Sequence, residues 1–171
     1  MLMSASDPKR TQPGMARRTS GEIVREYQEL NAFVDMYATH FRKIDPGSES
    51  HPTNVRKRIV AAVGISKALA GLRQAVNDCL EGLQDLTPME VQQLDTALRE
   101  VGIVTLTELR RRHSRKYKAV LKRGAVRDET EYYMVKAVLD ERTDALSATE
   151  LATLGGMLLA YETTLRSSVG E

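Results

Sequence analysis

The side chains most able to do chemistry form a basic run in the second half of the chain. Between positions 106 and 127 the 171-residue sequence has nine Arg and Lys residues, and Glu108 is the one acid there. Arginine and lysine neutralise phosphates and release the counterions condensed around a nucleic acid. The candidate anion-binding residues are Arg110, Arg111, Arg112, Arg115, Lys118, Lys122 and Arg123.

The charge distribution of the chain gives this run three interpretations. The net charge is only +2, and residues 128–171 hold nine acids and three bases. The basic helix can therefore meet the phosphates of DNA or RNA, or an acidic protein or membrane surface. It can also pair with the acidic segment that begins at Asp128, Glu129 and Glu131. What separates these cases is whether the basic side chains converge on one exposed surface.

We predict from this pattern a non-catalytic helical protein that binds an anionic partner, foremost DNA or RNA, through the helix over 106–127. The alternative is an oligomerising adaptor, a protein–protein interaction module with no nucleic-acid role. In that case the two long helices bind the partner, and the basic residues form a solvated or internally paired face.

No residues have the spacing of a catalytic, metal or cofactor site. Cys79 lies on an apolar helical stripe and is expected to be a core thiol. His113 is expected to be partly buried and hydrogen-bonded. His40 and His51 have no Cys or carboxylate at a metal-ligand spacing. We therefore expect no enzyme activity, no cofactor and no metal.

The elements that position the basic run follow an N-terminal segment without hydrophobic periodicity. Residues 1–19 contain Ser, Pro and charged residues and are expected to be a disordered tail. Met15 is an alternative start site to Met1, and the sequence does not decide between them. Thr19 and Glu22 have the spacing of a capping box, which predicts the start of the first helix.

Two long helices are predicted from apolar residues at heptad spacing. The first ends before the breaker at 45–47, and its stripe is Ile23, Tyr27, Leu30, Val34, Tyr37, Phe41 and Ile44. The second spans 53–85, and a row of small residues beside its stripe predicts close helix packing: Ala61, Ala68, Ala75 and Gly82. Because these stripes exceed what a small bundle easily buries, we expect a homodimer with the stripe over 23–44 as its seam.

Four shorter helices are predicted from N-capping signals. These signals are Thr87 with Glu90, Thr105 with Glu108, Asp128 with Glu131, and Ser147 with Glu150. The sequence thus predicts an all-α fold of about six helices, two long heptad-patterned helices followed by four shorter helices in a bundle. Residues 20–171 are expected to form a single helical domain, with a long hairpin over 20–86 and a smaller helical part over 87–171.

Composition agrees with an ordinary globular protein. Apolar residues make up 42% and charged residues 28%, and a single cysteine excludes an internal disulfide. The longest apolar stretch without a charge, 151–161, is far shorter than the roughly 20 residues of a transmembrane helix. With no apolar core for a secretory signal near the start, we expect a soluble cytoplasmic protein.

Overall fold

The computed structural model describes residues 18–141 and 146–169, and in these ranges the protein is all-helical, with eight helices and no strand. The predicted all-α class is confirmed, whereas the count of six helices and the bundle layout are not matched. Of the predicted tail, residues 1–17 lie outside the described residues. The helices are α1 (Ser20–His40), α2 (Pro52–Val63), α3 (Ile65–Gly82), α4 (Pro88–Glu100), α5 (Leu106–His113), α6 (Arg115–Arg123), α7 (Glu129–Asp140) and α8 (Ala148–Val169).

The predicted N-terminal caps are present. The hydroxyl of Thr19 accepts the backbone N–H of Glu22, and the carboxylate of Glu22 accepts the backbone N–H of Thr19. The same reciprocal capping box starts α4, and single side-chain caps start α5, α7 and α8. Each of these interactions joins residues three positions apart, so local sequence is enough to predict it.

The two extra helices come from breaks within predicted helices. Gly64 has φ +80° and ψ 160°, a conformation that L-residues rarely adopt, and it divides the helix predicted over 53–85 into α2 and α3. Ser114 has extended backbone, and its hydroxyl accepts the N–H of Tyr117 at 3.2 Å, which divides the predicted basic helix into α5 and α6. Serine favours such a cap over a helix interior.

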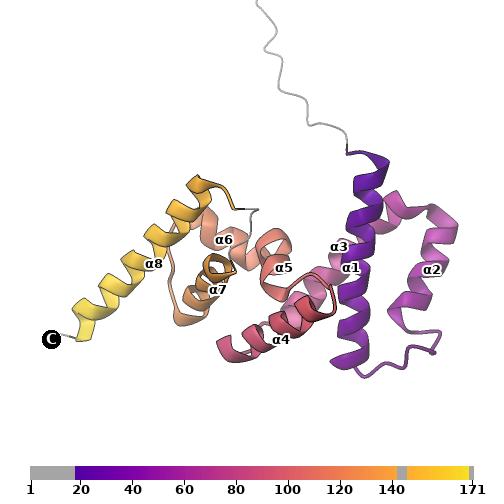
Figure 1. Ribbon diagram of the computed structural model, residues 1–171, viewed down its shortest axis with the longest axis horizontal. Helices are drawn as coiled ribbons and strands as arrows, with labels where there is room; N and C mark the ends of the chain where they lie inside the picture. Colours follow the sequence, from indigo (N-terminus) through magenta and orange to yellow (C-terminus); the bar gives the residue numbers. More distant parts are fainter. Residues whose placement is uncertain (1–17, 142–145, 170–171) are drawn as a thin grey trace, which may run out of the picture.

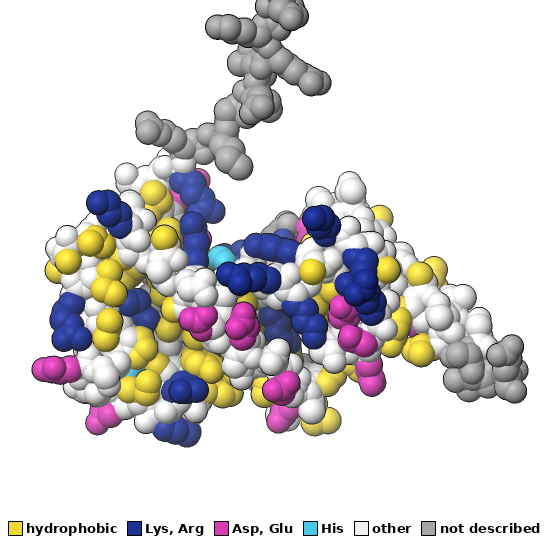
Figure 2. Space-filling view, turned by 180° about the vertical axis from the view of Figure 1, so that it is seen from behind, with side chains coloured by type: hydrophobic (Ala, Val, Ile, Leu, Met, Phe, Trp, Pro, Cys, Tyr) yellow, Lys and Arg dark blue, Asp and Glu magenta, His cyan; other side chains and the backbone are white. Residues whose placement is uncertain are grey.

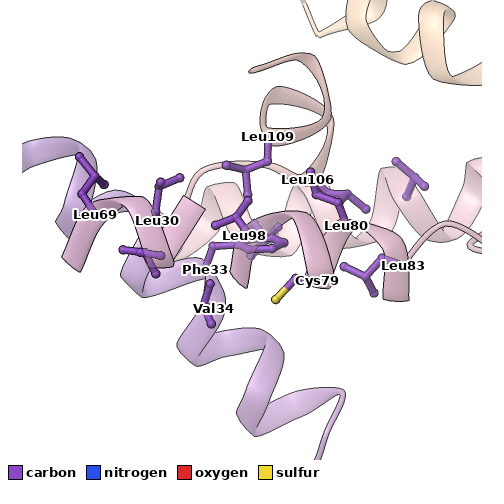
Figure 3. Packing of buried hydrophobic residues seen from close by; sticks show 13 residues of the cluster. Leu30, Phe33, Val34, Leu69, Cys79, Leu80, Leu83, Leu98, Leu106 and Leu109 are labelled. Carbon is purple, nitrogen blue, oxygen red and sulfur yellow. The ribbon is translucent and has the colours of Figure 1, made fainter. Parts of the chain in front are cut away.

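A first hydrophobic core, the N-terminal core, lies between α1, α3, α4 and α5. In Figure 1, α3 passes behind α1, and Figure 3 shows side chains of these four helices directed toward one another. Leu30 and Phe33 are fully buried there, together with Leu106 and Leu109. The heptad stripe of α1 therefore packs against α3 within one chain.

A second hydrophobic core, the C-terminal core, joins α6, α7 and α8. Its fully buried side chains include Tyr117 and Val120 of α6, Val135 of α7 and Leu154 of α8. Figure 1 shows α8 projecting from this end of the molecule, while α5 lies between the two groups of helices. The break at Ser114 thus separates α5, whose apolar side chains pack in the N-terminal core, from α6, whose apolar side chains pack in the C-terminal core.

Close helix packing is observed at Gly82, the last residue of α3. A Cβ at this position would lie 2.2 Å from the hydroxyl and 3.3 Å from the Cζ of Tyr37. The predicted row of small residues therefore permits a close approach here. Gly71, in contrast, has open space around its Cα and needs no such contact.

We expect Gly82→Ala to lower the free energy of unfolding by about 1 kcal/mol, because overpacking exceeds the gain in helix propensity. Gly71→Ala is the matched control, and we expect it to raise stability by about 0.5–1 kcal/mol. Urea denaturation followed by circular dichroism measures both. The double variant Gly82→Ala/Tyr37→Phe should recover part of the loss. Equal effects of the two alanines would contradict the close contact with Tyr37.

Candidate functional site

The basic run is divided between two helices that present their cations differently. Arg110, Arg111 and Arg112 lie on the last turn of α5, and the other four candidate residues lie on α6: Arg115, Lys118, Lys122 and Arg123. The candidate residues therefore do not form one continuous helical face. Their partners decide which of them remain available.

The arginines of α5 are engaged within the protein. The guanidinium of Arg110 donates to the carbonyl of Leu83 at 2.8 Å, and burial lowers the pKa of Arg110, an effect that Asp95 opposes. Arg111 donates two hydrogen bonds to the carboxylate of Glu108, at 2.8 and 2.9 Å. These hydrogen bonds to Glu108 are the main reason that the pKa of Arg111 is raised.

Arg111 and Arg112 belong to a chain of ion pairs that links three helices. Arg112 of α5 lies 2.6 Å from Glu29 of α1 and 3.0 Å from Glu108. Arg111 lies 3.6 Å from Glu150 of α8. The five side chains connect the helix at the start of the N-terminal core to the last helix of the C-terminal core. Because their guanidinium groups are paired with these carboxylates, Arg111 and Arg112 are poor candidates for an exposed anion site.

Arg123 is also matched by the acidic part of the chain. Its guanidinium donates to the carboxylate of Glu131, which is buried, and to the carbonyl of Ala125 at 3.0 and 2.8 Å. Internal pairing with the acidic segment therefore occurs at Glu131. Asp128 instead caps α7, and Glu129 forms no ion pair with a described residue.

The three remaining candidate residues form an outward basic face on α6, which we define as Arg115, Lys118 and Lys122. All three are exposed, and their side chains make no hydrogen bond or ion pair with any residue that the structure describes. The spacing of three and four residues puts them on one side of the helix, opposite the buried Tyr117 and Val120. Lys116 is also exposed but lies on a different side of α6.

Figure 2 shows Lys and Arg side chains gathered around a hollow in the middle of one side of the molecule. A cleft of about 440 Å³ is lined by residues of α1 and α5 and by Arg18, two residues before α1. Sequence reasoning missed this cleft, because it joins side chains far apart in the chain. No local pattern around Arg18 or Arg25 indicates that they lie near His113.

The histidines of the described residues do not form a metal-binding or catalytic arrangement. Within 18–141 and 146–169, no three His, Cys, Asp or Glu side chains lie close enough to hold a metal ion. His51, which is buried, accepts the N–H of Thr53 and contacts the hydroxyl of Thr39 at 3.1 Å. It is thus an N-cap of α2. His113 is half-buried as predicted, but it makes no hydrogen bond to a described residue.

Cys79 is a core thiol, as the sequence predicts, with 4% of its surface exposed. Burial raises the pKa of Cys79 to about 12, so little thiolate is present near neutral pH. We expect Cys79→Ala to lower stability by about 1–2 kcal/mol through lost burial and to leave any binding intact. The native thiol should react slowly with a thiol probe. Rapid labelling of the folded protein would contradict this placement.

No model of a known protein family, no curated protein and no solved structure matches this chain. In the part of the chain that the structure describes, no helix combines the length and hydrophobicity required to span a membrane.

Proposed function

We propose that this is a non-catalytic helical protein that binds the phosphate backbone of DNA or RNA through the outward basic face of α6. The main support is the exposure of the outward basic face. Arg115, Lys118 and Lys122 point away from the C-terminal core and have no acidic partner among the described residues. The other four candidate residues are engaged internally and contribute to the site only indirectly.

The spacing of the cations along α6 suits a ligand with regularly spaced phosphates. A rise of about 1.5 Å per residue puts Arg115 and Lys122 roughly 10 Å apart along the helix, with Lys118 between them. Long flexible side chains at this spacing reach successive backbone phosphates, which carry charge but no base information. The proposed contact is therefore independent of nucleotide sequence. An acidic protein or a membrane surface is the competing anionic partner.

We expect the affinity for duplex DNA or structured RNA to fall steeply with salt. Three neutralised phosphates contribute about −3 to the slope of log K against log salt concentration. The triple variant Arg115→Ala/Lys118→Ala/Lys122→Ala should remove that contribution and weaken binding equally for unrelated sequences. Fluorescence anisotropy over a series of salt concentrations measures both quantities. Stability should change little, because exposed charges contribute only tenths of a kcal/mol each.

A matched control variant tests whether location matters more than total charge. Arg42, Lys57 and Lys67 are exposed residues outside α5 and α6, and their side chains pair with no described residue. Replacing these three by Ala removes the same charges and should leave the salt slope nearly unchanged. Equal losses in the two triple variants would contradict a site on α6. Absence of binding at about 50 mM salt would overturn the nucleic-acid proposal.

The adaptor proposal retains support from exposed apolar side chains. Leu159 of α8 is 65% exposed, and Met89 and Tyr133 line a broad groove between α4 and α7. The stripe of α1 gives no support, because Leu30 is buried within the chain. If the α6 variants bind no differently from the wild type, these apolar surfaces become the leading candidates for function.

A further inference from the structure

The cleft between α1 and the end of α5 brings charged side chains of both helices together. Its volume is about 440 Å³, and it is lined by Arg18, Glu22, Arg25, Glu26, Glu29, Arg112 and His113. Figure 2 shows a histidine at the base of a hollow bordered by Lys and Arg side chains. The cleft is open to solvent and has room for a small anionic group.

The three carboxylates of the cleft already have partners. Glu26 accepts two hydrogen bonds from Arg73, at 2.8 and 2.7 Å, which hold the pKa of Glu26 below its usual range. Glu22 is occupied by the capping box of α1, and Glu29 lies 2.6 Å from Arg112. Glu22 lies near enough to Arg25, and Glu26 near enough to His113, for their charges to interact, but neither acid forms a hydrogen bond or ion pair with these two donors.

The donors that remain are Arg25 and His113. Neither side chain makes a hydrogen bond or ion pair within the described part of the chain. The three arginines that line the cleft balance its three glutamates, and Arg73 and Lys118 near His113 add two positive charges. The excess positive charge therefore comes from Arg73 and Lys118, which lie near His113 without lining the cleft, and the cleft has unused N–H donors on two walls.

We propose that this cleft binds a phosphate group, held by Arg25 and His113 and attracted by Lys118. The source of the phosphate rests on the proposed function, because the phosphate would belong to the backbone of a nucleic acid bound along α6. Lys118 belongs to the outward basic face and also lies close enough to act on His113, so it connects the two contacts. A guanidinium and an imidazolium together donate several N–H hydrogen bonds, which the oxygens of a phosphate can accept.

Protonation of His113 then accompanies binding. In the free protein, burial lowers the pKa of His113, and the charge of Arg112 adds to that effect. The charged groups that face its ring or line its cleft are Arg18, Glu22, Arg25, Glu26, Glu29, Arg73, Arg112 and Lys118. A bound anion favours the imidazolium and raises its pKa. Affinity should therefore increase as pH falls from the pKa of the bound state toward that of the free state.

The first test uses sulfate, which stays doubly charged throughout the range where histidine titrates. NMR titration of the full chain should show the pKa of His113 higher by about 1 in sodium sulfate than in sodium chloride of equal ionic strength. His40, which is exposed, provides an internal control in the same spectra. Arg25→Gln should reduce the shift at His113. Equal values for His113 in the two salts would overturn the cleft site.

The second test uses nucleic acid and separates the two proposals. The wild type should bind about tenfold more tightly at about pH 5.5 than at about pH 7.5, and His113→Gln should remove this difference. His40→Gln should retain it. Binding to nucleic acid with no response at His113 would overturn the cleft site and leave the function of α6 standing. A response to sulfate without nucleic-acid binding would support the cleft site and overturn the proposed function.

Discussion

Replacement of Leu30 by Asp is expected to unfold the protein. Leu30 is fully buried in the N-terminal core, where α1 packs against α3. Loss of a buried leucine side chain costs about 2–5 kcal/mol, and a buried unpaired carboxylate costs several more. Together these approach the whole stability of a typical domain, about 5–15 kcal/mol. Circular dichroism should show a loss of helix near room temperature.

The control for this substitution is Gln28→Asp, which adds the same charge to an exposed position of α1. Its stability should remain within about 0.5 kcal/mol of the wild type. The homodimer that the sequence predicts would sediment at about twice 19.1 kDa. If Leu30 served only as a dimer seam, Leu30→Asp would be a folded monomer, and that result would contradict the intrachain packing.

Replacement of Glu108 by Gln is expected to lower the free energy of unfolding by about 2–3 kcal/mol. Its carboxylate is the centre of the ion-pair chain and contacts both Arg111 and Arg112. The side chains of Glu108 and Arg111 are each only 16% exposed, so water replaces the lost charge poorly. Hydrogen bonds to charged groups contribute about 1.5–3 kcal/mol when they are this sheltered.

Urea denaturation at low and high salt measures this effect. Glu129→Gln removes an exposed carboxylate that pairs with no described residue, and it should change stability by less than about 0.5 kcal/mol. Because sheltered pairs are screened weakly, the loss in Glu108→Gln should persist at high salt. A loss that vanishes with added salt would mean that the ion-pair chain is only a surface feature.

Local signals account for the parts of the fold that the sequence predicts well. Thr19, Thr87 and Asp128 each cap a helix within a few residues, and the side chain that accepts is close in sequence to the N–H that donates. The sequence does not predict the breaks at Gly64 and Ser114. Ser114 lacks an acidic residue three positions later, so it does not have the full capping-box pattern.

The sequence by itself determined the helical class, most helix starts, the burial of Cys79 and the separation of basic and acidic segments. Only the tertiary structure decided which cations remain free. Glu29 and Glu150 lie far from the basic run in the chain, yet the packing of α1 against α3 and of α8 against α7 brings them to Arg112 and Arg111. The physical reason is range. Caps and helical periods act over a few residues, whereas ion pairs depend on which surfaces the two hydrophobic cores bring together.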